Sequence, residues 1–361
     1  MSHSSKEMIS FYLTTRCNLD CIYCYTNKNS DEHAHQCLDY EFAKAGIDDY
    51  YQTGLAHHVR FFGAGEPTVE LEQIQKILAY AKEKDSNTTS ELQTNGCFNR
   101  ITAEWVARNI DIVWISCDGL PKIQNYYRPM ADGGRSSDIL EYNIRYLSKN
   151  TKGITGIRMT ITNTNVHSQI AMIKYFADLG IRNFWVDPIF PGIGSSEPYE
   201  ELNMNTFTEE FLQAARYAYK NGMTYGSILT CNFDEPGEYA CRACLPVPHL
   251  TTDGYISACD MALFGNDANH MNVFIYGKWN KETKKIEYNH DKIKLLQSRK
   301  LSNMPHCKGC FVGKFCRGYC LGEVVNETQD LFGCKDRICE SVRKLFQELS
   351  EEEKKYRYSH P

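Results

Sequence analysis

The stretch ISFYLTTRCNLDCIYCYT, residues 9–26, joins a run of β-branched and aromatic residues to three closely spaced cysteines. The run predicts a strand from Ile9, and Cys17, Cys21 and Cys24 follow it in the spacing CxxxCxxC. A loop directly after a strand is where a parallel α/β barrel carries its chemistry. The stretch therefore predicts the first strand of such a barrel and a metal site in the loop beyond it.

Five further strand candidates alternate with amphipathic stretches along the first half of the chain. They begin at Val59 (VRFFG), Ser90 (SELQTN), Ile112 (IVWISC), Gly156 (GIRMTIT) and Asn183 (NFWVD). The stretches between them, such as residues 71–84 and 137–150, repeat apolar residues with the period of a helix. Six βα units predict parallel strands with right-handed crossovers, and they suit a partial (β/α)6 TIM-type barrel better than a closed eight-stranded one.

Length and composition exclude several classes of protein. The 361 residues fit two domains, and 42% hydrophobic with 24% charged residues is typical of a folded α/β protein rather than a disordered one. A net charge of -5 disfavours a nucleic acid partner. No apolar run is long enough for a secretory signal or a membrane helix, so we expect a cytoplasmic protein with no membrane partner.

Sixteen cysteines are many for a protein in a reducing compartment, where structural disulfides are unusual. Metal binding or catalysis is the better explanation, with Cys37, Cys97, Cys117 and Cys231 left over as buried, inert thiols. Turn-forming residues replace the βα pattern from about Asn232. We therefore expect a barrel domain over residues 1–235, a small cysteine-rich domain over 236–345 and a charged, solvated helix or tail over 346–361.

Three thiolates on one short loop can hold three corners of a 4Fe-4S cluster and leave the fourth iron open to a ligand from outside. A tetrahedral zinc site would want a fourth protein ligand, although a structural zinc loop or unligated thiols remain alternatives. The CxxxCxxC motif resembles that of the radical S-adenosylmethionine superfamily, in which the open iron binds the amino and carboxylate groups of this cosubstrate.

The resemblance extends to polar residues at the ends of successive strands. GAGEPT resembles the GGEP turn of the superfamily, which meets the methionyl amino group, with Ala64 in place of its first glycine. The motifs LQTNG and SCDG and the strand GIRMTIT follow in order. Each motif alone could be an ordinary turn, and Arg158 could form a structural ion pair. By resemblance, the residues implied to contact the cosubstrate or substrate are Tyr23, Gly65, Glu66, Pro67, Asn95, Ser116, Asp118 and Arg158.

The cysteines of the C-terminal region resemble the SPASM extension of peptide and protein maturases, which carries two auxiliary 4Fe-4S clusters. Zinc is the alternative, although these cysteines exceed two zinc sites. Cys241 lies closer to Cys244 than in sulfatase-maturating relatives, so an open iron in the first auxiliary cluster is a further alternative. The resemblance implies Cys241, Cys244, Cys259 and Cys320 for the first auxiliary cluster, and Cys307, Cys310 and Cys316 with either Cys334 or Cys339 for the second.

The resemblance also implies a role for Asp260, which follows Cys259 directly. In sulfatase-maturating relatives the corresponding aspartate resembles a general base at the substrate. The alternative is a carboxylate that only accepts hydrogen bonds from backbone amides at this turn.

Together the two resemblances imply an oxidoreductase that generates a 5'-deoxyadenosyl radical and oxidatively modifies or cross-links a peptide or protein. A flavodoxin- or ferredoxin-type protein would supply the electron. Only about eight residues precede the first strand, so we expect leader recognition by a separate protein or by the barrel itself. The alternatives are an enzyme of the same kind acting on a small metabolite or cofactor precursor, and a non-catalytic iron-sulfur carrier or zinc-stapled binding module.

Overall fold

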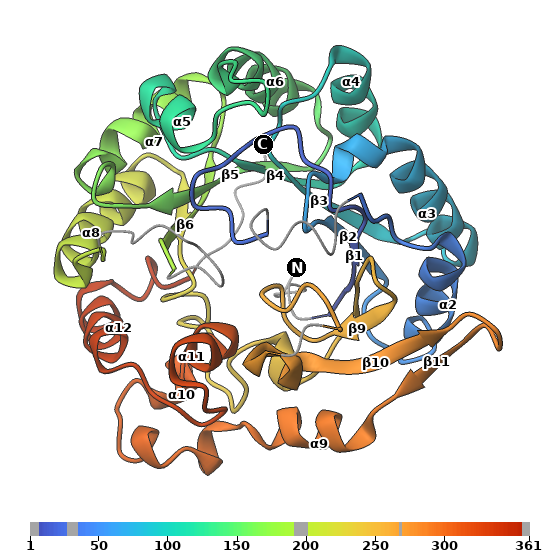
Figure 1. Ribbon diagram of the computed structural model, residues 1–361. Coiled ribbons are helices and arrows are strands. Elements are labelled where there is room, and N and C mark those ends of the chain that lie inside the picture. The colour runs from blue at the N-terminus through green and yellow to red at the C-terminus, as the bar shows by residue number, and fades with distance from the viewer. Residues whose placement is uncertain (1–6, 27–34, 191–200, 267–268, 356–361) are drawn as a thin grey trace.

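The computed structural model describes residues 7–26, 35–190, 201–266 and 269–355. It contains one 11-stranded sheet in the order β11-β10-β9-β8-β1-β2-β3-β4-β5-β6-β7 (Figure 1). The strands are β1 (Ile9–Tyr12), β2 (His58–Phe62), β3 (Thr89–Thr94), β4 (Ile112–Ser116), β5 (Ile154–Ile161), β6 (Asn183–Pro188), β7 (Thr224–Gly226), β8 (His249–Leu250), β9 (Tyr255–Ser257), β10 (Ile275–Asn280) and β11 (Lys285–Tyr288).

Helices α2 to α8 lie around the outside of the parallel strands (Figure 1). The α-helices are α2 (Tyr40–Tyr50), α3 (Leu71–Lys84), α4 (Arg100–Asn109), α5 (Pro121–Tyr127), α6 (Ser136–Asn150), α7 (Gln169–Asp178), α8 (Met204–Lys220), α9 (His290–Ser298), α10 (Gly313–Cys316), α11 (Leu321–Thr328) and α12 (Asp336–Glu348). The 3-10 helices are η3 (Pro67–Glu70), η4 (Val166–Ser168), η5 (Arg242–Cys244), η6 (His270–Phe274), η7 (Leu301–Asn303) and η8 (Pro305–Cys307).

The predicted partial barrel is confirmed, because β1 to β6 pair in chain order and every pair is parallel. Apolar side chains between strands and helices form its core, and Phe11, Phe61, Ile77, Ile115 and Phe176 are fully buried. Burial of a side chain of this size contributes about 1.5–3 kcal/mol relative to exposure. The carboxyl ends of β1 to β6, called the barrel mouth below, are therefore held by a continuous apolar layer.

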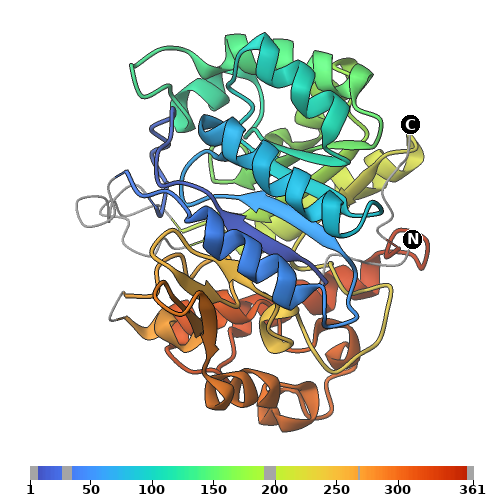
Figure 2. The ribbon, with the colours of Figure 1, turned by 90° about the vertical axis from the view of Figure 1, so that its right-hand side faces the viewer.

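The C-terminal region continues the sheet of the barrel. Strand β8 pairs in parallel with β1, placing His249 opposite Ser10, and β9, β10 and β11 follow as antiparallel neighbours. Figures 1 and 2 show this region along the side of the barrel that α2 to α8 leave uncovered. One sheet thus runs from the parallel strands of the barrel into the cysteine-rich region.

The end of the described chain differs from the predicted solvated tail. Helix α12 runs through residue 346 to Glu348 and buries Ile338, Val342 and Leu345. It packs on α8, where Arg216 forms an ion pair with Glu348 at 3.2 Å. The boundary expected at residue 346 therefore falls within a packed helix. None of the described helices is long and apolar enough to cross a membrane.

Candidate functional site

The three-cysteine loop lies at the barrel mouth, directly after β1. The Cys24 N–H donates to the Cys21 carbonyl at 3.0 Å, and the Leu19 N–H donates to Cys17 Sγ at 3.5 Å. Burial raises the pKa of Cys17 to about 11 and that of Cys21 to about 12. Both are neutral thiols near pH 7 without metal, so ligation must displace their protons.

The Glu66 carboxylate, buried at the end of β2, fastens two strand ends to each other. Its Oε1 accepts from the Thr68 N–H at 3.0 Å and from the Thr68 and Thr94 hydroxyls at 2.6 Å each. Its Oε2 accepts from the Asn95 N–H at 2.7 Å. Burial raises the pKa of Glu66, which these hydrogen bonds partly oppose. This carboxylate therefore shapes the turn, and its described partners already occupy both oxygens.

Gly65 explains how this turn reaches the cysteine loop. Its N–H donates to the Thr14 carbonyl at 2.8 Å, and a Cβ at this position would lie 2.1 Å from the Arg16 carbonyl oxygen. Real Cβ atoms do not approach backbone oxygen this closely, so either the turn or the loop would have to move. Pro67 follows as the first residue of η3.

We therefore expect Gly65→Ala to displace the loop that bears Cys17 and to lower the affinity for S-adenosylmethionine, the cosubstrate that the resemblance implies, by about tenfold or more. Equilibrium dialysis of the cluster-loaded protein measures the affinity. Gly54→Ala is the control for backbone strain alone: its φ of 75° disfavours alanine, but a Cβ there meets no atom within 4 Å, so this variant should keep the full affinity. An unchanged affinity in Gly65→Ala would show that the close packing of Gly65 on the Arg16 carbonyl does not matter for binding of the cosubstrate.

Asn95 links the same two segments from the end of β3. Its Nδ2 donates to Asn18 Oδ1 at 2.8 Å and lies 3.9 Å from Cys17 Sγ, while its Oδ1 accepts from the Cys97 N–H at 2.8 Å. The structure thus brings Asn95, Glu66, Gly65 and Cys17 together, as their order along the chain predicted.

Asp118 differs from the expectation that it faces the cosubstrate. Its side chain is fully buried, where Oδ1 accepts from the Thr160 N–H at 3.1 Å and Oδ2 accepts from Arg128 Nε at 3.0 Å and from the Tyr23 hydroxyl. Arg128 also lies 5.2 Å from the centre of the Tyr23 ring. Asp118 and Arg128 therefore hold the ring of Tyr23 in place.

A chain of polar side chains crosses the inside of the barrel. Gln93 Oε1 accepts from Arg158 at 2.8 Å and from Arg60 at 3.1 Å. Arg158 also donates to Asp187 Oδ2 at 3.2 Å, so the alternative of a structural ion pair is present at this residue. Ser116, half-buried, lies opposite Arg158 in the sheet register.

Asp260 is surrounded by three basic side chains. It accepts from Arg60 at 2.9 and 3.1 Å and from Arg242 at 2.5 Å, and its Oδ1 lies 3.1 Å from His249 Nδ1. Burial alone would raise the pKa of Asp260, but Arg242 and Arg60 hold it well below its usual range. Burial lowers the pKa of His249 to about 4. Asp260 is therefore a stable anion and a weak proton acceptor, which disfavours the expected role as general base.

The cysteine loop also meets the C-terminal region. The Tyr25 hydroxyl donates to the Asp260 carbonyl at 3.3 Å, and Tyr25 packs against a small apolar cluster that includes Leu263 and Phe264. The charges of Asp260, Cys24 and Cys259 all act on Tyr25. The three-cysteine loop and the segment around Cys259 therefore lie side by side at the barrel mouth.

Four C-terminal cysteines, Cys241, Cys244, Cys259 and Cys320, interact with one another. A hydrogen bond between the Cys241 and Cys244 side chains lowers the pKa of Cys241. Burial, followed by the charges of Cys241 and Cys259, raises the pKa of Cys320. These four residues come from η5, from the turn after β9 and from the start of α11.

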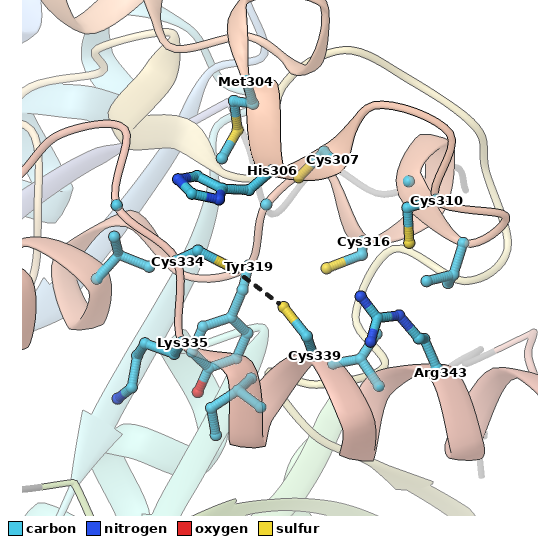
Figure 3. A pocket seen from close by; sticks show the side chains of 17 residues that line it. Met304, His306, Cys307, Cys310, Cys316, Tyr319, Cys334, Lys335, Cys339 and Arg343 are labelled. Carbon is cyan, nitrogen blue, oxygen red and sulfur yellow. Dashed lines mark hydrogen bonds between the residues drawn. The ribbon is translucent and has the colours of Figure 1, made fainter.

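A second group of five cysteines lines a pocket with about 500 Å³ of empty space, part of it open to solvent (Figure 3). The sulfur atoms of Cys334 and Cys339 lie 3.4 Å apart, and Arg343 lies at the rim. The cysteines of this pocket are Cys307, Cys310, Cys316, Cys334 and Cys339.

The four remaining cysteines divide into two pairs. Cys97 and Cys117 are buried as predicted, and burial raises the pKa of each to about 12. Cys37 is exposed and Cys231 is half-buried, so the prediction of burial is wrong for these two. Among the described residues, no three His, Cys, Asp or Glu side chains are close enough to hold a single metal ion.

The profile of the radical SAM superfamily matches residues 11–197, a segment that contains the cysteine loop and strands β2 to β6. The chain belongs to this superfamily. Its members use a 4Fe-4S cluster and S-adenosylmethionine, and three thiols on one loop at the barrel mouth are a donor set that fits such a cluster.

Two curated relatives match part of this chain. The uncharacterized protein MJ0907 of Methanocaldococcus jannaschii is 31% identical over 204 residues, 55% of this chain and 66% of that protein. The Fe-coproporphyrin III synthase of Methanosarcina barkeri is 27% identical over 245 residues, 66% of this chain and 58% of that protein. The chain thus matches less than two thirds of either relative.

Solved structures extend the likeness of fold to the C-terminal region. The structure of anSMEcpe with bound AdoMet has a TM-score of 0.72 at 19% identity and covers 94% of this chain and 96% of its own. Streptococcus suis SuiB bound to precursor peptide SuiA has a TM-score of 0.67 at 16% identity and covers 92% and 76%. The fold is therefore that of the barrel with its cysteine-rich extension.

Sequence reasoning missed the cations that organise the site. Arg60, Arg128 and Arg242 were not singled out, although each holds a carboxylate. A signal existed for Arg60, because a lone charge within the apolar strand HVRFF must find a buried partner.

Proposed function

We propose that this protein generates a 5'-deoxyadenosyl radical and uses it to oxidise or cross-link a side chain or α-carbon of a peptide or protein. The observation that carries the proposal is the contact of Tyr25, on the radical SAM loop, with the backbone of Asp260, beside Cys259. This contact supports the idea that the radical is formed, and the electron is removed from the substrate, at one and the same site, the barrel mouth. A flavodoxin- or ferredoxin-type protein would deliver the first electron.

Cys17, Cys21 and Cys24 would hold the cluster that binds S-adenosylmethionine. Tyr23, fixed by Asp118 and Arg128, offers a rigid aromatic face for the adenine. Six further residues would surround the rest of the cosubstrate: Gly65, Glu66, Pro67, Asn95, Ser116 and Arg158. Of these, Glu66 and Asn95 set the position of the cysteine loop.

When bound, the clusters supply the electron that cleaves S-adenosylmethionine and accept the electron that the substrate radical must lose. Loss of one hydrogen atom, one electron and one proton from the substrate is a two-electron oxidation, which needs an acceptor beyond the cosubstrate. The C-terminal cysteines would hold two such acceptors. We propose Cys241, Cys244, Cys259 and Cys320 for the first and Cys307, Cys310, Cys316 and Cys339 for the second.

We propose an anchoring role for Asp260. Its carboxylate neutralises Arg60 and Arg242 next to the mouth, and a proton acceptor held at so low a pKa gains little from deprotonating a substrate. Both guanidiniums are thereby held in place by ion pairs with the same carboxylate.

The substrate class can be tested with the cluster-loaded protein, S-adenosylmethionine and a reductant under anaerobic conditions. Short peptides encoded beside its gene should lose two hydrogens by mass spectrometry, with one 5'-deoxyadenosine formed per product. Turnover that required a tetrapyrrole or another small precursor, and left every peptide unchanged, would contradict the peptide proposal. A small precursor such as a tetrapyrrole is the second candidate substrate, because one relative of this chain is an Fe-coproporphyrin III synthase.

Cys334 and Cys339, neighbours in the pocket of Figure 3, can be replaced in a matched pair of variants. Spacing favours Cys339 as the ligand, and the Cys334 sulfur lies 3.4 Å from the Cys339 sulfur. Cys339→Ser should therefore lose about four of about twelve iron atoms, whereas Cys334→Ser should keep all of them, as measured by iron analysis and Mössbauer spectroscopy. The reverse result would assign the ligand to Cys334.

A further inference from the structure

Tyr319 occupies a tight turn between two cysteines assigned above to different auxiliary clusters. Arg317, Gly318 and Tyr319 all have positive φ, of 56°, 84° and 66°, a strained region that non-glycine residues rarely adopt. Buried Arg299 holds the turn by donating to the Arg317 carbonyl at 2.9 Å and the Gly318 carbonyl at 2.7 Å. A conformation this costly needs such support, and it fixes the direction of the Tyr319 ring.

The ring forms part of the wall between two cysteine-lined pockets. Tyr319 lines the pocket with about 500 Å³ of empty space described above and also a smaller pocket with about 290 Å³, each partly open to solvent. Cys231, Cys241 and Cys320 line the smaller pocket, and Cys316 lines both. In Figure 3 the ring points away from the sulfur atoms of Cys334 and Cys339, with its hydroxyl at the far end.

The hydroxyl of Tyr319 is buried and has no hydrogen-bond partner among the described residues. A buried hydroxyl without a partner has lost its hydrogen bonds to water with no compensation, so an orphaned one indicates a group that belongs beside it. Glu323 Oε1 is a second buried oxygen without a described partner, and its charge acts on this hydroxyl. A simple pairing of these two oxygens is therefore the competing explanation.

We infer that the Tyr319 hydroxyl donates a hydrogen bond to a sulfur atom of the first auxiliary cluster and thereby raises the reduction potential of that cluster. The inference rests on the proposed assignment of Cys241, Cys244, Cys259 and Cys320 as its ligands. Phenol is a donor near neutral pH. A donor to sulfur stabilises the reduced cluster, which carries one more negative charge, and hydrogen bonds of this kind tune iron-sulfur potentials. Tyr319 is thus a positioning residue for electron transfer.

The test compares Tyr319→Phe with the unchanged protein, both with Cys17, Cys21 and Cys24 replaced by alanine so that only auxiliary signals remain. Iron analysis and a redox titration followed by electron paramagnetic resonance give the content and the potentials. We expect about eight iron atoms in both proteins and a shift of one auxiliary signal, but not the other, to lower potential in Tyr319→Phe. Tyr50→Phe is the matched control, because its hydroxyl donates to the Ala56 carbonyl at 3.1 Å and Tyr50 lines neither pocket.

The outcomes separate this inference from the proposed function. Full iron content with both potentials unchanged in Tyr319→Phe would overturn the inference, and it is the result expected if the hydroxyl pairs with Glu323 or water. A shift of both signals, or a shift also in Tyr50→Phe, would overturn it too. Absence of auxiliary iron from the unchanged Tyr319 protein would instead overturn the proposed ligand assignment on which the inference rests.

Discussion

Replacing Cys17, Cys21 and Cys24 together by alanine is expected to remove about four of about twelve iron atoms and to abolish formation of 5'-deoxyadenosine. The physical reason is that these three thiols are the proposed protein ligands of the cluster that cleaves the cosubstrate. The auxiliary cysteines lie in separate segments, beyond residue 240. Iron analysis and chromatography of the nucleoside after reduction measure the two effects.

The control for the loop variant is Cys37→Ala. Cys37 is an exposed thiol whose sulfur lies 3.8 Å from the hydroxyl of Thr14, just ahead of the loop. The Cys37→Ala variant should bind as much iron and form as much 5'-deoxyadenosine as the unchanged protein. Nucleoside produced by the triple variant would contradict the account, since no other group of cysteines is assigned an open iron.

Replacing Asp260 by alanine is expected to lower the free energy of unfolding by about 3 kcal/mol, the lower end of the cost of breaking a buried ion pair, because the buried Arg60 guanidinium keeps only Glu91, 3.3 Å away, as a counter-charge. Arg60 has a side chain only 2% exposed and donates two hydrogen bonds to Asp260. Arg242 and His249 lose the same partner. Urea unfolding of the cluster-loaded protein under anaerobic conditions measures the loss.

Exposed Asp178, near the end of α7, supplies the control for this variant. Asp178→Asn should change the free energy of unfolding by no more than about 0.5 kcal/mol, as is usual for surface sites. If Asp260→Ala were equally mild yet stopped turnover, Asp260 would be acting on the substrate, and its anchoring role would be refuted.

The barrel and the radical SAM loop could be predicted from sequence because their signals are local. The spacing of apolar residues along the chain located the strands. The three cysteines of the loop lie within eight residues, from Cys17 to Cys24. The relation of Glu66 to Asn95 was also predictable, because parallel neighbours bring their carboxyl ends to one edge.

Features that depend on distant segments were not predictable. Arg60 and Asp260 are 200 residues apart and meet only because β8 pairs with β1. Strand β8 has two residues, too few to show any period. The burial of Asp118 depends on Arg128 and Thr160, which lie on different elements. Local patterns carry no information about such pairs.

The central claim is that the cluster on Cys17, Cys21 and Cys24 has an iron without a protein ligand, and electron-nuclear double resonance tests it most directly. The reduced, cluster-loaded protein would be mixed with S-adenosylmethionine labelled with ¹⁵N in the amino group and ¹⁷O in the carboxylate. An open iron predicts hyperfine coupling of both nuclei to the cluster, and loss of that coupling in the triple alanine variant. A spectrum unchanged by the labelled cosubstrate would contradict the claim.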